Sequence, residues 1–288
     1  MTTRSRRSFL RSSLSLASAA AVLPRSLSAA HEKLHIGVPD WTMNLGANPD
    51  AVALAAKIGF QGLQISFGRK LNGDKMPLDN PDLLARYLSL AKEQRIVIDG
   101  TCVDRLHDNG LKSDKLAPRF VSDGIRLTKA LKTQVLLLPF FGKWAITNQA
   151  EMDYVGDALR ELAPEAEKAG VILGLEDTIS AKDNVRIMDR SRSKHVKVYY
   201  DVGNSHQAGF DPVLEIRWLG KERICQFHLK DNPHFLGEGD IDFTPIMHTI
   251  LDMEFSGWAN LETDSHSEAV EADLRRNLMF VRDLVKHA

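Results

Sequence analysis

The 288-residue chain has few of the features that mark several common protein classes. It contains only two cysteines, Cys102 and Cys225, which are too few for a small disulfide-stapled scaffold. Because they lie in or just after different predicted strands, we expect two separate thiols in or near the core. No Cys-x-x-Cys pattern is present, so the sequence offers no thiolate zinc site.

The chain also lacks an apolar run long enough to cross a bilayer. Its first thirty residues nevertheless form a distinct segment. Arg6 and Arg7 precede a short run rich in Ser and Ala from Leu14 to Leu23, and a plausible cleavage site follows at Ser28–Ala30. This pattern predicts a twin-arginine signal over residues 1–30, recognition by the twin-arginine export machinery and a periplasmic or otherwise exported protein. That route carries folded proteins, which would suit a metal loaded before export.

An excess of positive charge is absent as well. The formal net charge is −1, and removing residues 1–30 removes five arginines and no acids, which leaves 32 Lys and Arg against 38 Asp and Glu. The resulting charge of −6 argues against a nucleic-acid-binding surface. The remaining 258 residues, 31–288, match one TIM barrel in length and can bury a large core as a single domain.

Strand-like and helix-like segments alternate along this part of the chain. Eight short apolar or β-branched runs are predicted strands, at residues 34–38, 62–67, 95–101, 135–139, 171–175, 196–200, 224–227 and 258–261. A helical pattern follows each one, and Gly203-Asn204 is interpreted as a turn after the sixth. Eight such units predict an α/β fold with a closed parallel sheet, a (β/α)8 TIM barrel.

Four consecutive predicted strands are followed by, or end in, residues suited to bind a metal. These are Glu176, Asp201, His228 and Glu262. In a parallel barrel the carboxyl ends of all strands lie at one rim, so the four side chains should converge. Taken singly, each is more often a solvated loop residue or a core histidine. Together, three carboxylates would repel one another unless a cation neutralised them, and this ligand set favours Mn²⁺, Mg²⁺ or Co²⁺.

The residues around these positions resemble the sugar phosphate isomerase/epimerase family of xylose-isomerase-like TIM barrels, which includes ketose 3-epimerases and hydroxypyruvate isomerases. The segments that carry the resemblance are Gly174-Leu175-Glu176, Tyr200–Asn204, Phe227–Asp231, Gly237–Phe243 and Asn260-Leu261-Glu262. The similarity covers essentially all of residues 31–288 and is densest from Gly174 to Glu262.

The resemblance implies one catalytic divalent cation, most often Mn²⁺, held by Glu176, Asp201, His228 and Glu262. It also implies that Glu176 and Glu262 are the catalytic residues, which move a proton on either side of a cis-enediolate. Elementary chemistry is consistent with these roles, because a cation near the carbonyl stabilises the enediolate charge and two carboxylates can remove and return the proton.

Further residues are candidates for substrate binding. Asn204 stands where many relatives have a histidine, and His206 lies close by in a different register. Arg217 precedes the seventh strand, and Lys230 follows His228 by two residues, on the same side of the strand. Arg217 could equally be an exposed helix residue, and Lys230 could merely pair with an acid. The long polar loop over residues 104–113 is expected to shape specificity.

The sequence therefore favours a divalent-metal-dependent isomerase or epimerase of a free sugar or small hydroxy-carbonyl compound. Export disfavours phosphorylated intermediates. A metal-dependent lyase or hydrolase acting on a keto-sugar or 3-keto-glycoside remains open, since the same groups would serve. An endonuclease-IV-like enzyme is disfavoured because Asp240-Ile241-Asp242 replaces its Asp-x-His. A non-catalytic carbohydrate-binding protein and a homo-oligomer, which relatives often form, also remain open.

Overall fold

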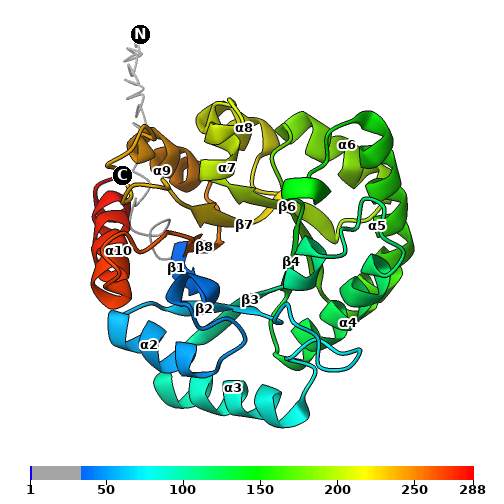
Figure 1. Cartoon of the computed structure of the whole chain (residues 1–288). Helices are drawn as coiled ribbons and strands as arrows, with labels where there is room; N and C mark the ends of the chain where they lie inside the picture. The colour runs from blue at the N-terminus through cyan, green and yellow to red at the C-terminus, as the bar shows by residue number, and fades with distance from the viewer. Residues whose placement is uncertain (2–33) are drawn as a thin grey trace.

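Eight parallel strands form a closed barrel in the computed structural model, which describes Met1 and residues 34–288 (Figure 1). The order around the barrel follows the chain, and the first strand pairs with the last. The strands are β1 (Leu34–Pro39), β2 (Gly62–Ser66), β3 (Val97–Cys102), β4 (Val135–Pro139), β5 (Ile172–Glu176), β6 (Val196–Asp201), β7 (Ile224–Leu229) and β8 (Gly257–Leu261). The predicted (β/α)8 barrel is confirmed, whereas the predicted signal lies, apart from Met1, outside the described residues.

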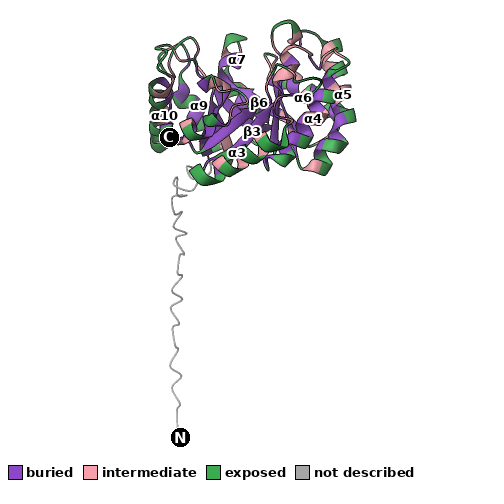
Figure 2. Ribbon diagram, turned by 60° about the horizontal axis from the view of Figure 1, so that its bottom comes forward, coloured by how far each residue is buried: buried purple, intermediate pink, exposed green. Residues whose placement is uncertain are grey.

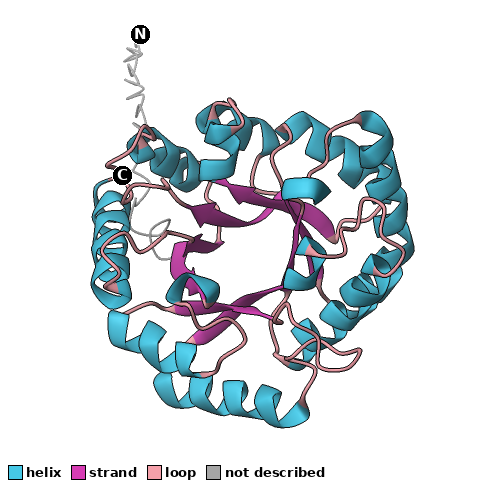
Figure 3. Ribbon diagram, in the orientation of Figure 1, coloured by secondary structure: helices cyan, strands magenta, loops and turns pink. Residues whose placement is uncertain are grey.

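Helices surround the barrel (Figure 3). They are α2 (Asp50–Ile58), α3 (Pro81–Gln94), α4 (Ala117–Ala130), α5 (Gln149–Ala169), α6 (Ala181–Ser191), α7 (Val202–Gln207), α8 (Pro212–Leu219), α9 (Phe243–Asp252) and α10 (Val270–His287). Among the described residues, none of these helices is both long and apolar enough to span a bilayer.

One local prediction was wrong. Gly203-Asn204 is not a turn but part of α7, which begins directly after β6. The reason is that Asp201 caps this helix, with its Oδ1 accepting a hydrogen bond of 2.7 Å from the backbone N–H of Asn204. The last residue of the strand is therefore also the N-cap of the helix, and this fixes the direction of the Asp201 carboxylate.

The strands are mostly apolar because both of their faces are covered (Figure 2). β4, with the sequence Val-Leu-Leu-Leu-Pro, is buried at all five positions. Several helices begin where a side chain satisfies their free N–H groups, as Asn80 does for α3, Asn148 for α5 and Ser180 for α6. Cys102 and Cys225 are both free thiols, as predicted.

The barrel interior contains a polar layer that two glycines make possible. A Cβ on Gly37 would lie 2.1 Å from Asn260 Oδ1 and 2.3 Å from Asp99 Oδ2, and a Cβ on Gly62 would also lie 2.3 Å from Asp99 Oδ2. These glycines are therefore required by the side chains that fill the space beside them, whatever their backbone angles.

We predict that Gly37→Ala destabilises the protein by about 1–3 kcal/mol, because the added methyl group overpacks the polar layer. Urea unfolding would measure this loss. The cost should be smaller in an Asn260→Ala background, where one of the two clashing side chains is gone. An equal cost in both backgrounds would show that the clash with Asn260 is not the cause.

Candidate metal centre

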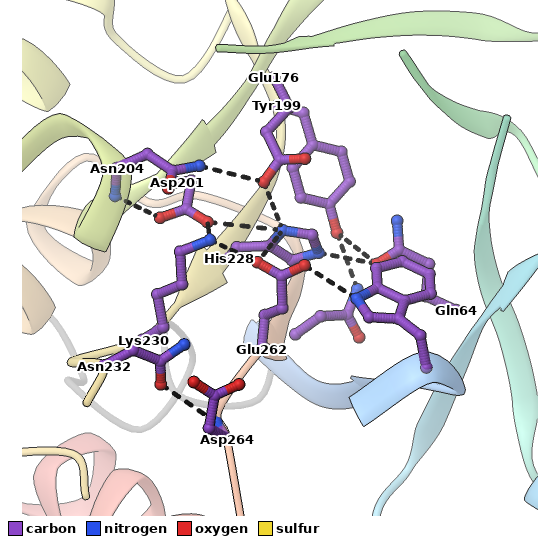
Figure 4. Close-up of polar contacts among 12 residues, drawn as sticks. Gln64, Glu176, Tyr199, Asp201, Asn204, His228, Lys230, Asn232, Glu262 and Asp264 are labelled. Atoms are coloured by element: carbon purple, nitrogen blue, oxygen red, sulfur yellow. Dashed lines mark hydrogen bonds and ion pairs between the residues drawn. The ribbon is translucent and has the colours of Figure 1, made fainter. Parts of the chain in front are cut away.

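Four neighbouring strands each bring one potential metal ligand to the same rim of the barrel (Figure 4). Glu176 ends β5, Asp201 ends β6, His228 lies near the end of β7, and Glu262 follows β8. Ligand atoms of the four residues all lie within 4.8 Å of one another. Glu176, Asp201 and His228 are buried, while the side chain of Glu262 is 19% exposed. The structure thus brings together the four residues predicted to bind a metal.

His228 lies at the centre of this cluster. Its Nδ1 is 2.9 Å from Glu176 Oε1, 3.5 Å from Glu262 Oε2 and 3.6 Å from Asp201 Oδ2. Burial alone would lower the pKa of His228, but the charges of Glu262 and Glu176 outweigh it and raise the pKa to about 10. Three carboxylates therefore face one ring nitrogen, an arrangement that attracts a positive charge.

The two buried carboxyl groups of the cluster have opposite pKa shifts. Burial raises the pKa of Glu176, since its partners only partly compensate for lost solvation. Burial acts on Asp201 in the same direction, but Lys230 and His228 outweigh it and lower the pKa of Asp201. Glu176 is therefore suited to exchange a proton near neutral pH, and Asp201 is suited to remain ionised.

Lys230 supplies a positive charge within the cluster. Its Nζ lies 2.8 Å from Asp201 Oδ2 and 2.6 Å from Glu262 Oε2. Three carboxylates and one ammonium leave two negative charges around His228, and these charges hold a proton on its ring, which a bound cation would replace. This residual charge and the mixed oxygen and nitrogen donors fit one divalent cation, which Glu176, Asp201, His228 and Glu262 would hold.

Two residues that were not predicted from the sequence make hydrogen bonds to the candidate metal ligands. His228 Nε2 makes a hydrogen bond of 2.8 Å with Gln64 Oε1 in β2, and Trp41 Nε1 donates one of 2.8 Å to Glu262 Oε1. The one indication of this role in the sequence is that Gln64 is a polar residue at the middle of a short buried strand. Metal-binding histidines usually make such a contact through their second nitrogen, and it fixes the orientation of the ring.

A cavity of about 490 Å³ opens beside the cluster. Glu176, Glu262, Lys230 and Asn204 line one part of it. The remaining wall is formed by Trp41, Gly46, Ser66, Gly68, Arg69, Cys102, Asp104, His107, Leu137, Pro139 and Phe141. The loop over residues 104–113 thus contributes Asp104 and His107, as expected of a loop that shapes specificity.

Two predicted substrate contacts are not brought to this cavity. His206 is half-buried in α7 and does not line it. Arg217 is exposed in the last turn of α8, a helix that returns the chain from the rim towards the start of β7. Asn204 and Lys230, by contrast, both line the cavity.

The chain also contains a His-Glu-x-x-His pattern at residues 31–35. This pattern binds zinc when its two histidines lie on one face of a helix. Here His35 lies in strand β1, where its ring packs against Trp258 at a centroid distance of 4.9 Å, and residues 31–33 lie outside the described part. The described residues therefore give no support for a second metal site there.

Comparison with known proteins agrees with the fold. The sequence profile described as xylose isomerase-like TIM barrel matches residues 52–284. The 2-epi-5-epi-valiolone 7-phosphate 2-epimerase of an Actinoplanes species is 26% identical over 203 residues, which is 69% of this chain and 73% of that protein. Inosose dehydratase of Geobacillus kaustophilus is 28% identical over 108 residues, 30% of this chain and 35% of that protein.

Among solved structures, D-psicose 3-epimerase with D-tagatose from Clostridium cellulolyticum superimposes with a TM-score of 0.74. The superposition covers 87% of this chain and 99% of that one, at 16% sequence identity. A likeness at this identity establishes a shared barrel fold.

We predict that Mn²⁺ raises the thermal unfolding midpoint of the protein and that Asp201→Asn weakens Mn²⁺ binding by about 100-fold or more. Removing a residue that is hydrogen-bonded to a metal ligand typically lowers metal affinity about 10–100-fold, so removing a ligand itself should lower it at least as much. Calorimetric titration would measure the affinity. Asp264→Asn is the matched control, because Asp264 is exposed and lies outside the cluster. Equal binding by both variants would contradict the assignment.

Proposed function

The chain belongs to the xylose isomerase-like TIM barrel family, and on that premise we propose that it is a divalent-metal-dependent isomerase or epimerase of a free sugar or small hydroxy-carbonyl compound. The observation that carries the proposal is the meeting of two glutamates, Glu176 and Glu262, at one cavity beside the candidate metal ligands. Mn²⁺ is the ion we propose, with Mg²⁺ and Co²⁺ as alternatives.

The two glutamates are suited to move a proton next to a carbonyl group. A divalent cation, when bound, supplies positive charge that stabilises a cis-enediolate. Glu176 and Glu262 come from β5 and from the residue after β8, and β6 and β7 lie between these strands. They therefore reach the cavity from two directions, which is the arrangement needed to remove a proton from one face of the substrate and return it to the other.

The surroundings of these two glutamates set the basicity of one and the orientation of the other. Burial raises the pKa of Glu176 and so makes its carboxylate a better base. Trp41 and Lys230 each bond one oxygen of Glu262 and so fix its direction. Asn204 lines the cavity next to Glu176, where its amide can bind a substrate hydroxyl.

The charges around the cavity support a substrate without a phosphate group. The Arg69 guanidinium lies 2.6 Å from Asp108, and the Lys230 ammonium already contacts two carboxylates. Burial first, and then the charge of Arg69, lower the pKa of His107, so its imidazole is neutral at pH 7. Among the described lining residues, no unpaired cation is therefore available for a phosphate dianion.

Elimination is the second candidate reaction. The same proton abstraction beside a ketone, followed by loss of a substituent from the next carbon, would make the protein a lyase or hydrolase of a keto-sugar or 3-keto-glycoside. The observation that favours this alternative is the similarity of 108 residues to a protein named inosose dehydratase.

We predict that the Mg²⁺-loaded protein incorporates deuterium from D₂O at the carbon beside the carbonyl of a free ketose. Glu262→Gln should abolish this exchange because it removes one of the two proton-transfer groups, and Asp264→Asn should not. NMR would follow both exchange and products. An intact carbon skeleton supports isomerisation, and a released aglycone from a 3-keto-glycoside supports elimination. Exchange on neither substrate, despite bound metal, would exclude the enediolate mechanism.

We also propose export through the twin-arginine route, from the pattern in residues 1–30. The double change Arg6→Lys and Arg7→Lys should retain the protein in the cytoplasm with its N-terminal segment uncleaved, because the pair is the recognised feature. Cell fractionation and the mass of the processed chain would measure this. Arg25→Lys is the matched control, and export of the double variant at the control's level would refute the proposal.

A further inference from the structure

A column of buried polar side chains runs through the barrel interior, away from the cavity. Gln64, Asp99, Tyr199 and Asn260 come from β2, β3, β6 and β8, and none is more than 4% exposed. The proposed proton transfer uses none of them. Polar groups are costly to bury unless they are hydrogen-bonded, so their presence requires a reason.

These side chains form a continuous chain of hydrogen bonds that begins at a candidate metal ligand. His228 Nε2 lies 2.8 Å from Gln64 Oε1, and Tyr199 donates its hydroxyl proton to the same oxygen over 3.2 Å (Figure 4). Asn260 Nδ2 then donates to the Tyr199 hydroxyl over 3.0 Å and to Asp99 Oδ1 over 3.2 Å.

The far end of this chain has two buried oxygens without a hydrogen-bond donor. They are Asp99 Oδ2 and Asn260 Oδ1. Both lie beside Gly37, at 2.3 Å and 2.1 Å from the point where a Cβ would be, so they are close to each other. Two acceptors in this position repel if Asp99 is ionised. A proton on Asp99 would instead join its carboxyl group and the Asn260 amide through two hydrogen bonds.

The surroundings of Asp99 favour this proton. Burial raises the pKa of Asp99 well above its ordinary value, and the hydrogen bond from Asn260 and the charge of His228 lower it only in part. No lysine or arginine is paired with Asp99 among the described salt bridges or among the causes of its shift.

We propose that Asp99 is a neutral carboxylic acid paired with Asn260, and that this pair, acting through Tyr199 and Gln64, holds His228 with Nδ1 towards the metal. Because Asn260 donates to Tyr199, the Tyr199 proton goes to Gln64 Oε1. That oxygen can only accept, so His228 Nε2 carries a hydrogen, and Nδ1 is the nitrogen that gives up its proton when the ring binds a cation. The four are positioning residues, and the inference rests on the metal proposed above.

Three substitutions separate this role from a merely structural one. Asp99→Asn keeps one donor and one acceptor towards Asn260 and should leave metal affinity unchanged. Asp99→Leu keeps a similar volume but removes both, and Tyr199→Phe removes the middle hydroxyl. Each of these two should weaken Zn²⁺ and Mn²⁺ binding by about 10–100-fold. Thr128→Val, which removes a buried hydroxyl bonded to Thr101, is the matched control and should bind as the wild type does.

A second measurement needs no metal. The infrared difference spectrum between the metal-free wild-type protein and Asp99→Asn should contain the carbonyl band of a protonated carboxylic acid. Absence of the band from this difference spectrum would overturn the acid–amide pair, whether or not the protein binds metal or has activity. Absence of metal binding by the wild type would overturn the metal centre, and the positioning role with it.

Equal loss of metal affinity in Asp99→Asn and Asp99→Leu would show that a charge is needed and would also overturn the proposal. If Asp99→Leu fails to fold, Tyr199→Phe decides the question, because wild-type metal affinity in that variant would show that the column does not position His228. Lack of deuterium exchange on any substrate would overturn the proposed reaction. It would not affect the conclusions drawn from the infrared and affinity measurements.

Discussion

Repulsion among three carboxylates at one rim of the barrel is the constraint on which the rest of this structure depends. Glu176, Asp201 and Glu262 all face His228 Nδ1. Carboxylates held this close destabilise a protein unless positive charge compensates them. Lys230 compensates part of that charge, and the remainder explains why a divalent cation fits the site.

Holding such a cluster requires a rigid frame, and the closed barrel provides one. Each candidate ligand lies at or next to the end of a strand that is hydrogen-bonded on both sides. Around the rim, Trp41 and Gln64 bond the ligands themselves, and Gln64 connects them to a polar column that reaches Asn260. The fold and the site are therefore not separable, since the side chains that fill the barrel also orient its ligands.

The sequence predicted that the four candidate ligands would converge, because their positions follow from a local rule. Glu176, Asp201, His228 and Glu262 each stand where a strand ends, and parallel strands in a barrel end at the same rim. The short helix α7 was missed because Gly203-Asn204 is typical of a turn, and only the Asp201 cap shows that a helix starts there.

Contacts between distant parts of the chain could not be predicted in this way. Gln64 and His228 are 164 residues apart, and Trp41 and Glu262 are 221 residues apart. Their meeting depends on closure of the barrel and not on any nearby pattern. Arg217 illustrates the converse, because a helix position near the right strand does not tell which end of that helix approaches the cavity.

Closure also has a consequence for how the protein matures. The four candidate ligands come from the second half of the chain, but Gln64, which contacts His228, comes from β2, and β1 pairs with β8 to close the barrel. The centre is thus complete only after both ends of the chain have been synthesised and joined. Tight binding of an ion would then report that the barrel has closed, because an open barrel can present all four candidate ligands but lacks the contact from β2 that orients His228.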